Sequence, residues 1–65
     1  MKITLNGEPR EILHAQNVRE LLDELALPPH AILIEHNGTA LRREEWDATL
    51  HEADRVEIIR IVAGG

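Results

Sequence analysis

The chain has 65 residues, of which 43% are hydrophobic, 2% aromatic and 29% charged, and its 12 acidic and 7 basic residues give a formal net charge of -5. This length suits one small domain with a marginal core, so an enzyme that encloses its own substrate pocket is not expected. The acidic balance, scattered arginines and single aromatic residue argue against a nucleic-acid partner. With no cysteine, the chain has neither a disulfide nor a thiolate metal site.

The sequence also argues against membrane insertion and secretion. No apolar run approaches the roughly 20 residues that span a bilayer. Residues 1–7 alternate in character and end in a turn, whereas a secretory signal has a basic start and a longer apolar stretch. We therefore expect no membrane partner and a cytoplasmic location.

The first predicted element is a β-hairpin. Residues 2–5 alternate polar and apolar side chains at the period of a half-buried strand. Asn6-Gly7 supplies the positive backbone dihedral angles of a tight turn. Residues 10–13 are long enough to form the returning strand, with Pro9 at its mouth.

An amphipathic helix follows the hairpin. Asn17 is a capping residue, and Glu20 stands three positions later, where its side chain reaches back to the backbone N–H of the cap. The apolar residues then recur at helical spacing: Val18, Leu21, Leu22 and Leu25. Leu27-Pro28-Pro29 is predicted to end the helix, because a residue before proline disfavours helical angles.

A second hairpin and an irregular segment come next. Residues 31–35 form a short apolar run of strand length, Asn37-Gly38 is a second turn, and residues 39–41 pair back. From Arg42 to Arg55 the charges are dense, which predicts turns and one turn of helix anchored by the large apolar residues Trp46 and Leu50.

The last predicted strand covers residues 56–62 and has apolar residues on both faces. These include Ile58, Ile59, Ile61 and Val62. Such a strand is either central in its sheet or has an outer face that meets a partner.

This order of elements predicts an α+β fold with two layers. One helix covers only one face of a sheet of four to five strands, so the other sheet face is open. We expect residues 1–65 to form a single domain with a flexible tail at 62–65.

Most candidate catalytic residues are interpreted as solvated surface side chains. The histidines lack the close spacing of a two-ligand metal motif: His14, His30, His36 and His51. The pairs Asp23-Glu24 and Glu44-Glu45 are interpreted as solvated carboxylates, and no glycine-rich phosphate loop exists. We therefore assign no catalytic residue and no metal site.

The residues 62–65, Val-Ala-Gly-Gly, carry the chemical hypothesis. Two glycines at a given pair of positions occur by chance at roughly 0.5%. Ala63, Gly64 and Gly65 have almost no side chains, so they suit threading through a narrow channel of another protein. If a partner adenylates the Gly65 carboxylate with ATP, attack by sulfur gives a thiocarboxylate and attack by an amine gives an amide.

The chain resembles the ubiquitin-like β-grasp fold and, within it, the sulfur carrier family of thiamine biosynthesis. The resemblance covers nearly the whole chain, and its most distinctive part is the Arg-x-x-Trp segment at 43–46. Members commonly have Gly-Asp before the last strand, where this chain has Ala53-Asp54, and Pro where it has Arg42. The related small subunit of molybdopterin synthase approaches its glycines through Phe-Pro-Pro, whereas residues 60–62 here are Arg-Ile-Val.

The resemblance implies a mechanism carried out with partners. A ubiquitin-activating-type adenylating enzyme binds the open sheet face, threads the tail and adenylates Gly65. A cysteine desulfurase system supplies sulfur, and thiazole synthase takes it from the thiocarboxylate. ATP and zinc belong to the partner enzyme, so no cofactor is expected on this chain. From the residues, we expect Ile59, Ile61 and Val62 to form the partner-docking surface.

Two alternatives remain open at this point. The chain could serve another sulfur acceptor, such as molybdopterin or an amino-acid pathway. It could instead be a ubiquitin-like protein modifier or interaction domain whose glycine end is joined to amines.

Overall fold

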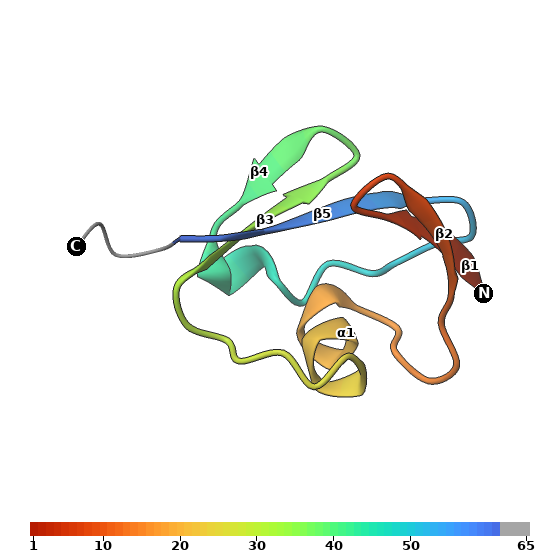
Figure 1. Ribbon diagram of the computed structural model, residues 1–65, viewed down its shortest axis with the longest axis horizontal. Helices are drawn as coiled ribbons and strands as arrows, with labels where there is room; N and C mark the ends of the chain where they lie inside the picture. Colours follow the sequence, from red (N-terminus) through yellow and green to blue (C-terminus); the bar gives the residue numbers. More distant parts are fainter. Residues whose placement is uncertain (62–65) are drawn as a thin grey trace.

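The structure is a computed structural model that describes residues 1–61 (Figure 1). Its elements are, in chain order, β1 (Lys2–Leu5), β2 (Glu8–Glu11), α1 (Val18–Glu24), β3 (Ile32–His36), β4 (Thr39–Leu41), the 3-10 turn η1 (Arg43–Glu45) and β5 (Arg55–Arg60). The expected strand, strand, helix, strand, strand, irregular segment and strand are therefore all present.

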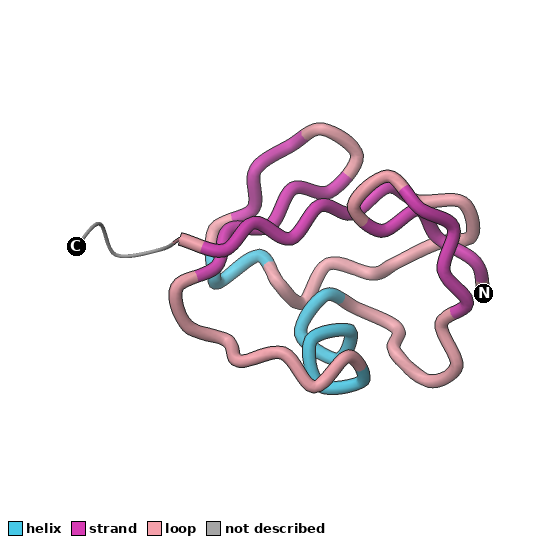
Figure 2. The backbone as a smooth tube through the Cα atoms, in the orientation of Figure 1, coloured by secondary structure: helices cyan, strands magenta, loops and turns pink. Residues whose placement is uncertain are grey.

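The five strands form one mixed sheet with the order β2-β1-β5-β3-β4. β1 and β5 run parallel, and the other neighbours are antiparallel. Helix α1 covers one face of this sheet, and loops on either side of η1 complete that layer (Figures 1 and 2). The predicted α+β fold with one open sheet face is confirmed.

Strand β2 begins two residues earlier than predicted. Asn6 and Gly7 both have positive φ angles, so they form a two-residue loop that pairs Leu5 directly with Glu8. Pro9 consequently lies inside the strand rather than at its mouth. The edge position of β2 tolerates a proline because its missing N–H removes no bond from the middle of the sheet.

The start of α1 differs from a capping box by one residue. The Asn17 side chain accepts a hydrogen bond from the Glu20 backbone N–H at 2.8 Å, as predicted. The Glu20 carboxylate, however, accepts from the backbone N–H of Gln16, also at 2.8 Å, and not from that of Asn17. The acidic side chain therefore fixes the entry loop rather than the cap residue.

The helix ends at Glu24, before the prolines that were predicted to stop it. Ala26 adopts a left-handed φ of 56°. Its N–H donates to the Asp23 carbonyl, and the N–H of Leu27 donates back to the Leu22 carbonyl at 2.9 Å. This is a Schellman arrangement, which closes a helix by bonding its last carbonyls.

The core lies between α1 and the inner face of the sheet. Its buried residues are Ile3, Ile12, Ala15, Val18, Leu21, Leu22, Ile32, Ile34, Trp46, Leu50 and Val56. Trp46 is only 3% exposed, which confirms its predicted role as an anchor. The Arg43 guanidinium lies 5.0 Å from the centre of the Trp46 ring and donates to the Pro29 carbonyl, so η1 is tied to the segment before β3.

Strand β5 lies in the centre of the sheet, which is one of the two alternatives that its apolar residues predicted. It spans Arg55–Arg60 rather than 56–62. The Ile61 N–H still donates to the Ala31 carbonyl at 2.8 Å, so the backbone is held for one residue beyond the strand. Val62 lies outside the described residues.

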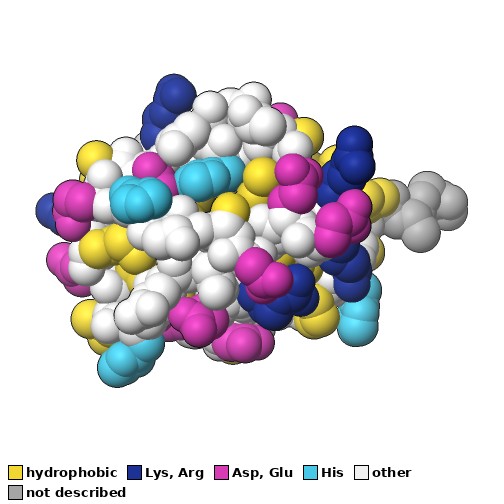
Figure 3. Space-filling model, turned by 180° about the vertical axis from the view of Figure 1, so that it is seen from behind, with side chains coloured by type: hydrophobic (Ala, Val, Ile, Leu, Met, Phe, Trp, Pro, Cys, Tyr) yellow, Lys and Arg dark blue, Asp and Glu magenta, His cyan; other side chains and the backbone are white. Residues whose placement is uncertain are grey.

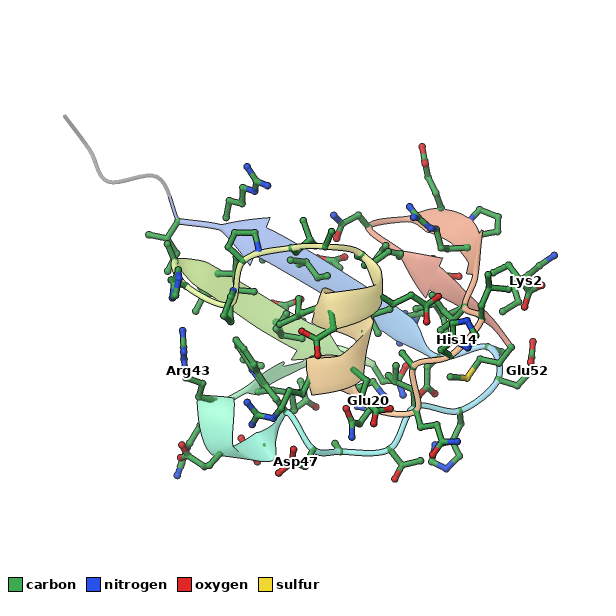
Figure 4. All side chains as sticks on the ribbon, turned by 90° about the horizontal axis from the view of Figure 1, so that it is seen from below. Lys2, His14, Glu20, Arg43, Asp47 and Glu52 are labelled. Atoms are coloured by element: carbon green, nitrogen blue, oxygen red, sulfur yellow. The ribbon has the colours of Figure 1, made fainter. Side chains whose placement is uncertain are left out.

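The segment 51–54 closes the fold through backbone hydrogen bonds to β1. Ala53 N–H donates to the Lys2 carbonyl at 2.8 Å, and the Glu52 carboxylate accepts from the Lys2 N–H (Figure 4). Ala53 makes this turn with a φ of 71°, a conformation that glycine adopts without the steric cost of a Cβ atom. The Ala-Asp departure noted in the sequence therefore falls on a position that favours glycine.

We expect Ala53→Gly to stabilise the chain. Glycine relieves the strain of the left-handed backbone conformation, but it also raises the conformational entropy of the unfolded chain. The net increase in the free energy of unfolding is about 1 kcal/mol, which raises the melting temperature by about 4 °C. Ala40→Gly is the matched control, because Ala40 lies in a strand, where glycine is destabilising. Equal losses of melting temperature in both variants, measured by circular dichroism, would contradict this account.

Candidate functional site: the open sheet face and the end of β5

The open sheet face carries an apolar pair beside an acidic pair. In the antiparallel register of β3 and β5, Leu33 lies opposite Ile59, and Glu35 lies opposite Glu57. Side chains alternate across a strand, so these four residues point away from the core-facing Ile34. Leu33 is 53% exposed and Ile59 is 42% exposed. We call the surface formed by Leu33, Ile59 and Ile61 the apolar patch.

Ile61 extends the apolar patch toward the end of the chain. It directly follows β5 and is 51% exposed, although its backbone N–H is bonded. The structure therefore presents Ile59 and Ile61 as exposed apolar side chains on a held backbone. The other predicted site residues, Val62, Ala63, Gly64 and Gly65, lie outside the described residues.

Leu33 belongs to the apolar patch, although the sequence pattern did not predict this. The short apolar run at 31–35 predicts a strand but assigns no residue of it to the open face, whereas Ile32 and Ile34 are buried and Leu33 is exposed. The two-residue period of a strand would have placed Leu33 on the open face. Its pairing with Ile59 depends on the β3–β5 register, which no local pattern specifies.

The prediction that His36 is a solvated imidazole is wrong. Its Nε2 atom lies 2.7 Å from Asp54 Oδ2, and the two side chains are only 16% and 12% exposed. The Asp54 carboxylate also accepts from the His51 backbone N–H and the Asn37 side chain. Burial opposes ionisation of Asp54, but these hydrogen bonds outweigh it, so its pKa lies below the usual value. The cluster joins the β3–β4 hairpin to the turn before β5.

Glu24 is likewise not merely solvated. Its carboxylate accepts three backbone N–H groups, from Leu13, His14 and Ala15, each at 2.8 Å. These hydrogen bonds stabilise the charged form and lower the pKa of Glu24 from its ordinary value of 4.5. Together with Glu20, Glu24 holds the loop that leads into α1, near His14 in Figure 4.

These lowered pKa values predict a loss of stability in acid. A carboxylate with a depressed folded-state pKa contributes stability above its unfolded pKa, and the contribution is lost as the pH falls through the folded value. The free energy of unfolding should therefore decline below about pH 4.5.

Glu24→Gln should reduce that acid dependence. Glutamine has one acceptor oxygen, whereas Glu24 uses both, so the variant is less stable than the parent chain near pH 7 and approaches it near pH 3. Urea unfolding at several pH values measures the difference. Asp23→Asn, on an exposed neighbour, is the control. If the free energy of unfolding of Glu24→Gln is lower than that of the parent chain by the same amount at every pH, Glu24 is not a source of the acid dependence.

The charged side chains form no continuous basic surface on the face seen in Figure 3, where acidic and basic groups are interspersed. Within residues 1–61, no three His, Asp or Glu side chains come together closely enough to hold a metal ion. In the same described part of the chain, no helix is both long and apolar enough to cross a membrane.

Two known proteins are similar to this chain over most or all of their length. The crystal structure of a thiamine biosynthesis protein (ThiS) from Geobacter metallireducens matches with a TM-score of 0.83 and 38% sequence identity, covering 100% of both chains. An uncharacterized protein, ycf40, from Porphyra purpurea is 36% identical, and the match covers 93% of its length.

Part of a longer enzyme is also similar. A thiazole synthase from Magnetococcus marinus is 33% identical over 66 aligned positions, and this chain spans 20% of that protein's length. The model of the ThiS family matches residues 3–65, which includes both terminal glycines. The chain therefore belongs to the ThiS family.

Proposed function

We propose that the chain is a sulfur carrier of thiamine biosynthesis and that the carboxyl carbon of Gly65 holds the sulfur. The observation that carries this proposal is the match, over the full length of both chains, to a thiamine biosynthesis protein. The fold supports it, because β5 leads from the centre of the sheet directly toward residues 62–65. The chain acts as a co-substrate, and the catalytic groups belong to its partners.

The proposed chemistry has three steps. A ubiquitin-activating-type adenylating enzyme uses ATP: a Gly65 carboxylate oxygen attacks the α-phosphate, pyrophosphate leaves, and an acyl-adenylate forms. The terminal sulfur of a persulfide from a cysteine desulfurase system then attacks the carbonyl carbon and displaces AMP, which gives an acyl disulfide. A thiol of the partner system reduces this acyl disulfide by forming a disulfide with the donor sulfur, and the thiocarboxylate is released. The small residues Ala63 and Gly64 admit this end to a narrow channel. ATP serves the partner, and we place the reaction in the cytoplasm.

Thiazole synthase is the proposed sulfur acceptor. The support is that a thiazole synthase contains, within one polypeptide, a segment similar to this entire chain. Covalent attachment raises the effective concentration of one module at another, so a carrier and its acceptor gain from such an arrangement. Delivery to thiazole synthase is therefore favoured over delivery to a molybdopterin or amino-acid pathway.

The apolar patch, together with Val62 as the next residue in the sequence, is the proposed docking surface for the adenylating enzyme. Exposed apolar side chains on a rigid sheet suit the central part of a protein interface. The proposal is supported by the chain order, because Ile61 directly follows β5 and precedes the residues that the enzyme would thread.

Isotope exchange between pyrophosphate and ATP tests the adenylation step. The purified chain should stimulate exchange by the adenylating enzyme encoded in the same genome. No stimulation by the chain, with an enzyme that adenylates another carrier, would overturn the proposal. Conjugates in which Gly65 is linked to lysines of other proteins would instead support the modifier alternative.

A further inference from the structure

Two glutamates occupy opposing strand positions beside the apolar patch, and no ion pair among the described residues neutralises either of them. Glu35 and Glu57 occupy directly opposite positions in β3 and β5, two register positions from the Leu33–Ile59 pair that lies on the same face. None of the ion pairs within residues 1–61 includes either carboxylate. Arg55, two residues before Glu57 on the same strand, is not ion-paired with them either.

This arrangement costs the isolated domain stability. Like charges directly opposite one another on neighbouring strands are destabilising. The carboxylates of Glu20, Glu24 and Asp54 accept backbone hydrogen bonds that hold loops in place. No such bond to Glu35 or Glu57 occurs in the described part of the chain, and Ala40, opposite Glu35 in β4, is uncharged.

We propose that the protein that covers the apolar patch also carries an arginine or lysine that binds between Glu35 and Glu57. The inference rests on the proposed function, because it takes the adenylating enzyme as that protein. A guanidinium fits two adjacent carboxylates particularly well, since its planar fork presents several donors. The acidic pair thus selects a partner with a cationic group next to an apolar centre.

Charge complementarity disfavours a second copy of this chain as the occupant. Two copies docked through the same face would bring four carboxylates together, and each chain already has a net charge of -5. A partner with a cation removes the repulsion within the acidic pair as it binds. Binding then relieves a strain that the free domain retains.

Affinity and stability are measured in the same variants, because we expect the affinity for the partner to fall while the stability of the free domain rises. Glu57→Gln and Glu35→Gln are each titrated against the adenylating enzyme by calorimetry without ATP, at low and at moderate salt. We expect about tenfold weaker binding at low salt and a smaller salt dependence. The melting temperature of the isolated variant should rise by about 2 °C, because the like-charge repulsion is removed.

Two further variants separate the possible outcomes. Glu44→Gln removes the same charge from η1, which lies on the α1 side of the sheet, and should change neither quantity (Figure 1). Leu33→Gln changes the apolar patch without changing charge and should weaken binding. If Leu33→Gln weakens binding but both glutamate variants bind like the parent chain, the cation inference is overturned and the docking surface stands.

If none of these variants alters affinity, the docking surface itself is wrong and the inference fails with it. Neither outcome decides the sulfur chemistry, which pyrophosphate exchange measures separately. Sedimentation equilibrium showing a stable dimer of the chain, lost in Leu33→Gln, would overturn the choice of partner in favour of a second copy.

Discussion

One alanine added after Gly65 is expected to abolish adenylation while the fold and docking persist. The added residue moves the terminal carboxylate by about 3.5 Å along the chain. Because displacement of a reacting atom by about 1 Å already costs on the order of a hundredfold in rate, adenylation should fall at least that far. The apolar patch ends at Ile61, so binding should remain within about twofold of the parent chain.

Pyrophosphate exchange measures the adenylation, and calorimetry measures the binding. Removal of the added alanine by a carboxypeptidase should restore exchange, which shows that the extended protein was folded and competent. Adenylation of the extended chain at the parent rate would refute the assignment of the reacting group to the Gly65 carboxylate.

A lysine at Ile59 should weaken binding to the adenylating enzyme by at least thirtyfold. The substitution removes an apolar contact from the centre of the proposed interface, and central contacts of this kind contribute about 2 kcal/mol or more. It also places a positive charge near the cation proposed for the partner. Because Ile59 is 42% exposed in the free chain, the lysine side chain reaches solvent and the fold is retained.

Leu13→Lys is the matched control for this variant. Leu13 is 75% exposed and lies in the loop between β2 and α1, outside the apolar patch. Its replacement introduces the same charge, so it should leave affinity nearly unchanged. Equal affinities for Ile59→Lys and the parent chain, with both proteins folded by circular dichroism, would exclude Ile59 from the docking surface.

Local patterns predicted the order of elements because each pattern depends on neighbouring residues. Asn6-Gly7 and Asn37-Gly38 have the positive φ angles that tight hairpins require. Asn17 caps α1 as its position indicated. The predicted end of α1 was wrong. Prolines are recognisable helix stops in a sequence, whereas alanine is uncommon at the left-handed position that Ala26 occupies.

The parts that depend on long-range contacts could not be predicted in the same way. His36 and Asp54 are 18 residues apart and meet only because β5 pairs with β3. Leu33 joins Ile59, and Glu35 meets Glu57, through that same register. Ile59 and Ile61 are exposed, as predicted, because one helix cannot cover both faces of a sheet.

Intact-mass spectrometry tests whether Gly65 carries the sulfur. The purified chain is incubated with its adenylating enzyme, ATP, a persulfide donor and a thiol reductant, and its mass is compared before and after. We expect a mass gain equal to the replacement of one oxygen by sulfur, and fragmentation should localise this gain to Gly65. An unchanged mass with an enzyme shown to be active, or a sulfur located elsewhere in the chain, would contradict the account.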